Sequence, residues 1–190
     1  QVTDRLIAEA RTLVDDPHQT LKDSGQYTDE NLLIGALGEI AVIDYCWNND
    51  LLIFKNEGRS SDLKLYSGQT VEVKTQKVSS APELHYRVIA ESRSENTERS
   101  DFYFFTHLQY VAGRPEAVYL LGGCSFDKFW RLSERHLQGS PMMRHYPDGN
   151  EVANGRYFTF DTNLLPISQL APPSATLKHF KSLQQREEAQ

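Results

Sequence analysis

The sequence predicts a mixed α/β fold in which helices pack on a β-sheet. Two observations favour it: two helical patterns precede a run of strand-like segments, and further helical patterns follow that run. Such an order is typical of a layered domain built around one core. The 190 residues suffice for one such domain, and contents of 39% hydrophobic and 24% charged residues are those of a globular protein.

Two helices are expected before the strands. Apolar residues recur at helical spacing over residues 3–15, and a polar connection follows at 18–27. The second helix should start near Thr28, a good N-cap, and end near residue 47. Gly35 and Gly38 each cost this helix about 1 kcal/mol relative to alanine, so we expect close packing against a sheet.

The middle of the chain carries most of the strand-like segments, which are 51–55, 62–66, 69–75, 85–89, 101–108 and 118–121. The nearly continuous apolar and aromatic sequence of 101–108 is typical of a central strand buried on both faces. After the strands we expect a helix over 125–136, a loop over 138–155, a short strand at 157–160 and a last helix over 174–185.

The hairpin over residues 62–75 carries the strongest functional signal. Both of its strands alternate apolar and polar residues, so one face should be apolar and the other charged. The apolar set is Leu63, Leu65, Val71 and Val73, and the charged set is Asp62, Lys64, Glu72 and Lys74. A loop of two or four residues would pair Asp62 with Val73, so the leucines of one strand and the valines of the other would lie on opposite faces. A three-residue loop over 66–68, with Gly68 left-handed, keeps the sets together and pairs Asp62 with Glu72.

This register predicts a metal site. Carboxylates about 4 Å apart repel by about 4 kcal/mol at an effective dielectric constant of 20, so the opposed pair favours a bound cation. Mg²⁺ suits one or two carboxylates with waters and phosphate oxygens, and we expect Mn²⁺ to substitute for it. Asp62 and Glu72 would be ligands, with the Val73 backbone carbonyl as a further one. The metal could then polarise a phosphodiester, while Lys74 orients or deprotonates the attacking water or stabilises developing charge.

Asp62 followed by Glu72-Val73-Lys74 on a hairpin resembles the PD-(D/E)XK nuclease superfamily, also called the restriction-endonuclease-like fold. This family places a glutamate on the helix before the hairpin, and Glu39 occupies the matching position. Ser61 stands where the family often has proline. The resemblance covers about residues 28–125.

The resemblance implies a mixed central β-sheet flanked by helices and Mg²⁺-dependent phosphodiester hydrolysis. Asp62 and Glu72 would be metal ligands, Lys74 the catalytic lysine, and Glu39 a ligand through water or of a second metal. We therefore expect a single nuclease domain over 1–190. Its core would span about 28–125, and the extension over 126–190 would serve substrate recognition or dimerisation.

The charge distribution limits how the chain could bind nucleic acid. Residues 1–62 carry 12 acidic and 5 basic residues, residues 63–190 carry 14 and 15, and the net charge is −6. This balance excludes a protein that coats nucleic acid by charge alone, so contacts should be local. The candidate contact residues are Gln76, Lys77, Arg131, Arg135 and Arg144.

Other site chemistries find little support. Two cysteines, Cys46 and Cys124, cannot form a disulfide framework or a four-cysteine zinc site, and we expect both to be buried in a cytoplasmic protein. His107 is interpreted as a hydrogen-bonded core residue. No phosphate-binding loop, dinucleotide fingerprint or serine-hydrolase elbow occurs, and no apolar run is long enough to span a membrane.

The leading hypothesis is a Mg²⁺-dependent nuclease, with DNA favoured over RNA and endonuclease over exonuclease. Because one site cuts one strand, cleavage of a duplex would require two copies, for example a homodimer. The alternative is a catalytically silent module of the same fold that binds nucleic acid or protein within a larger complex. A hydrolase of small phosphate esters is the third hypothesis, which the shallow strand-face site disfavours.

Overall fold

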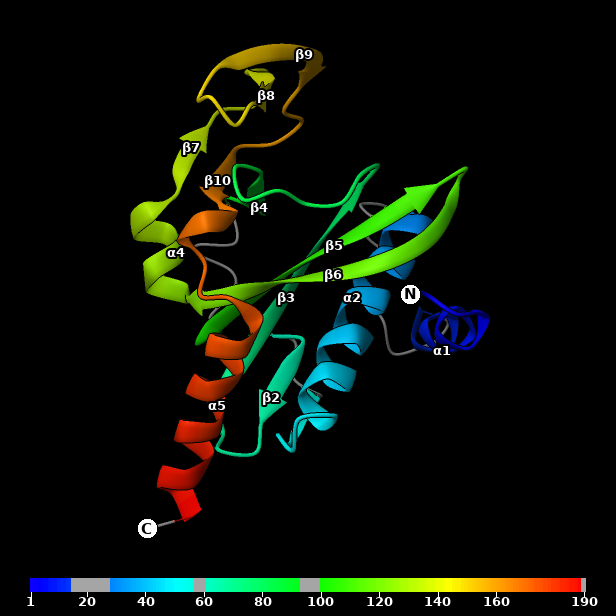
Figure 1. Ribbon diagram of the computed structural model, residues 1–190, viewed down its shortest axis with the longest axis vertical. Helices are drawn as coiled ribbons and strands as arrows, with labels where there is room; N and C mark the ends of the chain where they lie inside the picture. Colours follow the sequence, from blue (N-terminus) through cyan, green and yellow to red (C-terminus); the bar gives the residue numbers. More distant parts are fainter. Residues whose placement is uncertain (15–27, 57–60, 93–99, 189–190) are drawn as a thin grey trace.

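The computed structural model describes residues 1–14, 28–56, 61–92 and 100–188 (Figure 1). The helices are α1 (Asp4–Val14), α2 (Asp29–Trp47), α4 (Phe126–Leu132) and α5 (Pro173–Glu188), with a 3-10 turn η2 (Ile167–Gln169). The strands are β1 (Ile53–Lys55), β2 (Leu63–Leu65), β3 (Thr70–Val78), β4 (Arg87–Glu91), β5 (Phe102–Val111), β6 (Arg114–Ser125), β7 (Glu134–His136), β8 (Pro141–His145), β9 (Glu151–Tyr157) and β10 (Thr162–Pro166).

Five strands form the main sheet, in the order β1-β2-β3-β5-β6. β3 and β5 run parallel, whereas the other neighbours in this sheet are antiparallel, so the sheet is mixed. β5 lies between β3 and β6, and six consecutive residues in it are buried. The expected central strand is therefore confirmed, as is a mixed α/β fold with a mixed central sheet.

Different elements pack on the two faces of the main sheet. α2 and α5 pack on one face, in a core that includes Val42, Phe104 and Phe180, and α1 packs against α2. On the other face, α4, β4 and β10 surround a core that includes Phe129 and Leu165. The β8–β9 hairpin projects from one end of the molecule, and α5 with the C-terminus lies at the opposite end (Figure 1).

Helix α2 begins and packs largely as expected. The hydroxyl of Thr28 accepts a hydrogen bond from the Asn31 backbone N–H, with 3.2 Å between the atoms. A Cβ atom on Gly38 would lie 1.8 Å from Oγ1 of Thr75 and 2.8 Å from Oγ1 of Thr106. Close packing on the sheet is thus confirmed at Gly38. It is wrong for Gly35, where an added Cβ would meet nothing within 4 Å.

The β2–β3 hairpin has the expected register. Leu63 pairs with Val71 and Lys64 with Thr70. The backbone N–H of Leu65 donates to the Gln69 carbonyl at 2.8 Å, which leaves a three-residue loop closed by Gly68 at a φ of +92°. The four apolar residues of the hairpin all lie in the core shared with α2 and α5.

Several expectations for the second half of the chain are wrong. The segment 138–155 contains most of the β8–β9 hairpin rather than a loop, and of the strand expected at 157–160 only Tyr157, the last residue of β9, lies in a strand. The helix expected over 125–136 ends at Leu132, because Ser133 adopts extended angles and β7 follows. β10 pairs with both β4 and β7 in a second, three-stranded sheet. The extension after residue 125 therefore shares a sheet with β4 from the expected core.

The remaining expected elements correspond closely to observed ones. The first helix and the last helix are α1 and α5, and the segment 85–89 corresponds to β4, which lies two residues further along the chain. The connection expected over 18–27 lies outside the described residues. None of the described helices combines the length and the hydrophobicity of a membrane-spanning segment.

The two cysteines are buried, as expected, and both are free thiols. Burial raises the pKa of the Cys46 thiol to about 12 and that of the Cys124 thiol to about 11. Both thiols are therefore protonated at neutral pH, which makes them poor nucleophiles and poor metal ligands.

Candidate functional site

Asp62 lies immediately before β2, where the chain enters the hairpin. Its Oδ2 atom accepts a hydrogen bond from the backbone N–H of Val73 at 2.8 Å. One step beyond the Leu63–Val71 pair, the register places Asp62 opposite Glu72. The carboxylate of Asp62 is thus fixed on β3 beside Glu72, as the sequence predicts.

Glu72 and Lys74 project from β3 on the face of the sheet that α4 and β4 cover. The Lys74 ammonium donates a hydrogen bond to Oε1 of Glu72 at 2.9 Å. It also lies 6.0 Å from the centre of the Tyr103 ring. The Glu72 side chain is only 12% exposed, so water solvates its carboxylate poorly. The positive charge of Lys74 partly neutralises this carboxylate.

Glu39 reaches the same region from α2. Its Oε2 atom pairs with the ammonium of Lys55, the last residue of β1, at 2.7 Å. Burial raises the pKa of Glu39, the Lys55 pair lowers it, and the negative charge of Glu72 raises it further. The negative charge of Glu72 therefore lies close enough to oppose ionisation of the Glu39 carboxyl group.

The backbone of β3 adds a further oxygen donor to this region. A strand residue points its N–H and its C=O toward the same edge of the strand. Since the Val73 N–H meets Asp62, the Val73 carbonyl points toward the edge of β3 on which Asp62 lies. This direction is compatible with the ligand role expected for that carbonyl.

The donor set fits Mg²⁺ in its chemistry. Carboxylate and carbonyl oxygens are the ligands that this ion prefers, and it keeps several waters when only one or two carboxylates bind. In the described part of the chain, His, Cys, Asp and Glu side chains form no group of three that could hold a metal by themselves. A Mg²⁺ ion here would therefore rely on two carboxylates, the Val73 carbonyl and water.

The predicted nucleic-acid contacts fall into two groups. Gln76, Lys77 and Arg144 line a single cleft of about 790 Å³ between the end of β3, β4 and the β8–β9 hairpin. Lys77 also pairs with Glu30 of α2 at 2.5 Å. Arg131 on α4 and Arg135, which pairs with Asp161 at 2.8 Å, do not line this cleft.

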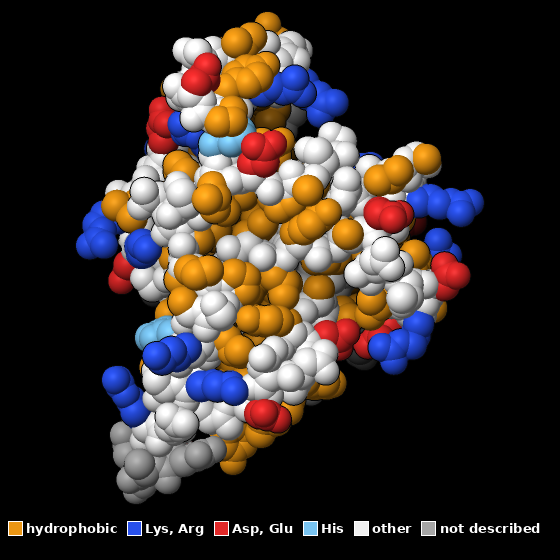
Figure 2. All heavy atoms as spheres, in the orientation of Figure 1, with side chains coloured by type: hydrophobic (Ala, Val, Ile, Leu, Met, Phe, Trp, Pro, Cys, Tyr) orange, Lys and Arg blue, Asp and Glu red, His pale blue; other side chains and the backbone are white. Residues whose placement is uncertain are grey.

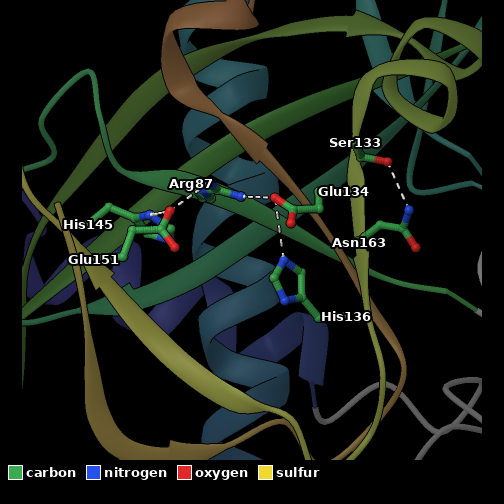
Figure 3. A network of polar contacts seen from close by, with 7 residues as sticks. All are labelled: Arg87, Ser133, Glu134, His136, His145, Glu151 and Asn163. Carbon is green, nitrogen blue, oxygen red and sulfur yellow. Dashed lines mark hydrogen bonds and ion pairs between the residues drawn. The ribbon is translucent and has the colours of Figure 1, made fainter. Parts of the chain in front are cut away.

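Sequence reasoning missed the polar network beside this cleft, in which Arg87 of β4 bridges two other strands (Figure 3). Arg87 pairs with Glu134 of β7 at 2.7 Å and with Glu151 of β9 at 3.2 Å. Glu151 also contacts His145 of β8 at 2.6 Å. The hydrogen bond to Arg87 is the largest cause that lowers the pKa of Glu134. No local pattern in the sequence indicates this network, because Arg87 lies 47 residues before Glu134 and 64 residues before Glu151 along the chain.

The interpretation of His107 is wrong in one respect. His107 is fully buried in β5, as expected, but neither of its ring nitrogens has a hydrogen-bond partner among the described residues. Burial lowers the pKa of His107 to about 4, so the ring is neutral at pH 7.

Comparison with known proteins provides no assignment. No protein-family model matches the chain, and no curated protein matches it significantly.

Proposed function

We propose that this protein is a metal-dependent nuclease that hydrolyses phosphodiester bonds of DNA, with a restriction-endonuclease-like fold of the PD-(D/E)XK type. One observation carries the proposal: β3 brings Glu72 and Lys74 together, Asp62 is bonded across to Val73, and Glu39 approaches from α2. A buried carboxylate whose ionisation a neighbouring carboxylate opposes destabilises the fold, and a bound divalent cation offsets this cost.

Each residue has a distinct role in this proposal. Asp62, Glu72 and the Val73 carbonyl would hold Mg²⁺, or Mn²⁺ in its place, and Glu39 would act through a water or at a second ion. When bound, the ion polarises the phosphate and lowers the pKa of water. The Lys74 ammonium, held by Glu72, orients the attacking water and stabilises negative charge that develops on the phosphate.

The wider assignment follows from this chemistry. We favour a nucleic-acid polymer over a small phosphate ester as substrate, DNA over RNA, and internal cleavage over cleavage from an end. Because one copy holds one such site, a homodimer would be needed to cut both strands of a duplex. Two free, buried cysteines are compatible with a reducing compartment such as the cytoplasm.

A catalytically silent module that binds nucleic acid or protein is the second candidate. Two observations favour it: lysines already pair with Glu39 and Glu72, and no group of three metal-binding side chains occurs in the part of the chain that the structure describes. A silent module has no need for divalent ions.

Cleavage and calorimetry together separate the two candidates. The wild-type protein is incubated with plasmid, linear, branched and single-stranded DNA and with RNA, in Mg²⁺, in Mn²⁺ or in EDTA. A nuclease cuts at least one substrate only when a divalent ion is present. A protein that cuts none of them, and that gives no heat when titrated with Mg²⁺ with or without DNA, is the silent module.

A further inference from the structure

The cleft beside the β8–β9 hairpin continues the face of the sheet that carries Glu72 and Lys74. Gln76 is the next residue of β3 on that face, roughly 7 Å beyond Lys74 at the rise of a strand, and it lines the cleft. A nucleic-acid strand held at Lys74 and running along β3 would therefore reach the cleft within one or two nucleotides.

The lining of the cleft is basic, although the chain is acidic overall. Four Lys or Arg residues line it against a single acidic residue, Glu83, among the described residues, whereas the chain carries a net charge of −6. Arg87 and Lys77 already pair with glutamates. Arg144 and Arg156 make no ion pair with any described residue, which leaves two guanidinium groups on the hairpin for an anionic ligand such as a phosphate.

Aromatic rings lie beside these arginines. Tyr146, in the turn of the hairpin, is 39% exposed and lines the cleft together with Tyr86 of the segment before β4. Basic and hydrophobic side chains lie next to each other on the projecting hairpin (Figure 2). A positive groove combined with flat aromatic surfaces is the arrangement by which proteins hold unpaired nucleotides.

The inner end of the cleft has polar groups that the fold leaves unsatisfied. Oε1 of Gln76 and both ring nitrogens of His107 are buried and have no hydrogen-bond partner among the described residues. The two residues are register partners on β3 and β5. The amide oxygen is an acceptor, and a neutral imidazole offers one donor and one acceptor. The polar edge of a nucleobase carries complementary groups.

We propose that this cleft binds one unstacked nucleotide of the nucleic-acid strand. Its phosphate lies at Arg144 and Arg156, its base stacks on Tyr146, and the polar edge of the base faces Gln76 and His107. The identification of the ligand as part of a nucleic-acid strand rests on the proposed function. The recognition chemistry itself, a base with a phosphate, would also accept a free nucleotide.

The first test measures binding without cleavage. Fluorescence anisotropy follows a labelled single-stranded oligonucleotide and the matching duplex in EDTA. The double variant Arg144→Gln/Arg156→Gln should weaken single-strand binding by about 10-fold or more and flatten its salt dependence. The control Arg114→Gln/Arg186→Gln removes the same charge from two exposed arginines outside the cleft and should change affinity by less than about 2-fold. Equal losses in both double variants would overturn the proposal.

A second variant separates ligand binding from folding. Gln76→Leu removes a buried acceptor that has no protein partner, so it should raise the melting temperature of the unliganded protein while weakening oligonucleotide binding. If Gln76 served only the fold, the variant would melt at a lower temperature and bind normally, and the assignment of the inner end of the cleft would be wrong.

Competition identifies the source of the ligand. Nucleoside monophosphates should displace the oligonucleotide only at concentrations far above its own dissociation constant. If a mononucleotide binds tightly and the oligonucleotide does not bind, the ligand of the cleft is a free nucleotide rather than a nucleic-acid strand. That result would overturn the proposal. If the cleft variants bind the oligonucleotide normally and the protein still cleaves DNA, the proposed role of the cleft is rejected and the proposed nuclease function stands. If the cleft variants lose binding but the wild type cleaves no substrate, the proposed role of the cleft stands and the nuclease function is rejected.

Discussion

The carboxylate of Asp62 accepts a hydrogen bond from the backbone N–H of Val73, with 2.8 Å between Oδ2 and N. Leu63 and Val71 form the outermost backbone pair of β2 and β3, and this bond lies just beyond that pair. A side chain therefore continues the connection between the two strands where the backbone ladder stops. The carboxylate is held beside Glu72 as a consequence, which is the arrangement on which the proposed metal site depends.

Magnesium should stabilise the folded protein through Glu72. At about ten times its dissociation constant, a ligand of the native state adds about 1.4 kcal/mol to the free energy of unfolding, which raises the melting temperature of a protein of this size by a few degrees. Glu72→Gln should lose most of this shift. Glu116→Gln, an exposed acid on β6, should keep it. Thermal melts in EDTA and in Mg²⁺ measure the effect, and equal shifts in both variants would contradict the assignment.

Gly38 and Gly35 should respond oppositely to alanine. Gly38→Ala forces a Cβ atom against Thr75 and Thr106, so we expect the free energy of unfolding to fall by about 1–3 kcal/mol. Gly35→Ala meets open space and should gain up to about 1 kcal/mol from helix propensity. Urea denaturation gives both values. Similar changes in the two variants would mean that α2 does not approach the sheet as described.

Stability should fall as the pH is lowered, in part because of His107. Its pKa is about 4 in the folded protein against an ordinary value of 6.5, so the unfolded chain binds more protons between these values. This difference should lower the free energy of unfolding by about 2 kcal/mol between pH 7 and pH 5. Urea denaturation of wild type and His107→Leu isolates the contribution, which should be absent in the variant. Identical pH dependence of the free energy of unfolding in the two proteins would show that protonation of His107 does not destabilise the fold.

Arg87 should hold the β8–β9 hairpin in place. Its side chain is 18% exposed and bridges Glu134 and Glu151, so Arg87→Ala should leave the hairpin tied to the rest of the fold by fewer contacts. Hydrogen exchange over residues 141–157 should become faster, while the amides of β3 and β5 keep their protection. Arg135→Ala breaks only one exposed pair, with Asp161, and should leave the hairpin unchanged. Faster exchange in neither variant would mean that Arg87 does not position the hairpin.

Local patterns were enough to predict the hairpin that carries the candidate site. Its two-residue alternation determines which side chains share a face, and Gly68 selects a loop length that keeps the register. Asp62 and Glu72 could be paired from these facts alone. The link between Glu39 and Lys55 could not, because it depends on where the end of β1 lies against α2.

The second sheet and the projecting hairpin could not be predicted in the same way. β10 is five residues long and pairs with β4 and β7, which are distant in sequence. Every residue of β9 is exposed, so it lacks the alternation of hydrophobicity by which a half-buried strand is recognised. The same segments form part of the cleft, which explains why only Gln76, Lys77 and Arg144 of its lining are among the nucleic-acid contacts predicted from the sequence.

Cleavage by matched lysine variants tests the central proposal most directly. Lys74 contacts Glu72 in the candidate site, whereas Lys64 is an exposed lysine of the same hairpin. Wild type and Lys64→Ala should cut DNA in Mg²⁺ at similar rates, and Lys74→Ala should cut at least about 100-fold more slowly because it loses a group that stabilises the transition state. Cutting by Lys74→Ala at the wild-type rate would contradict the proposed site.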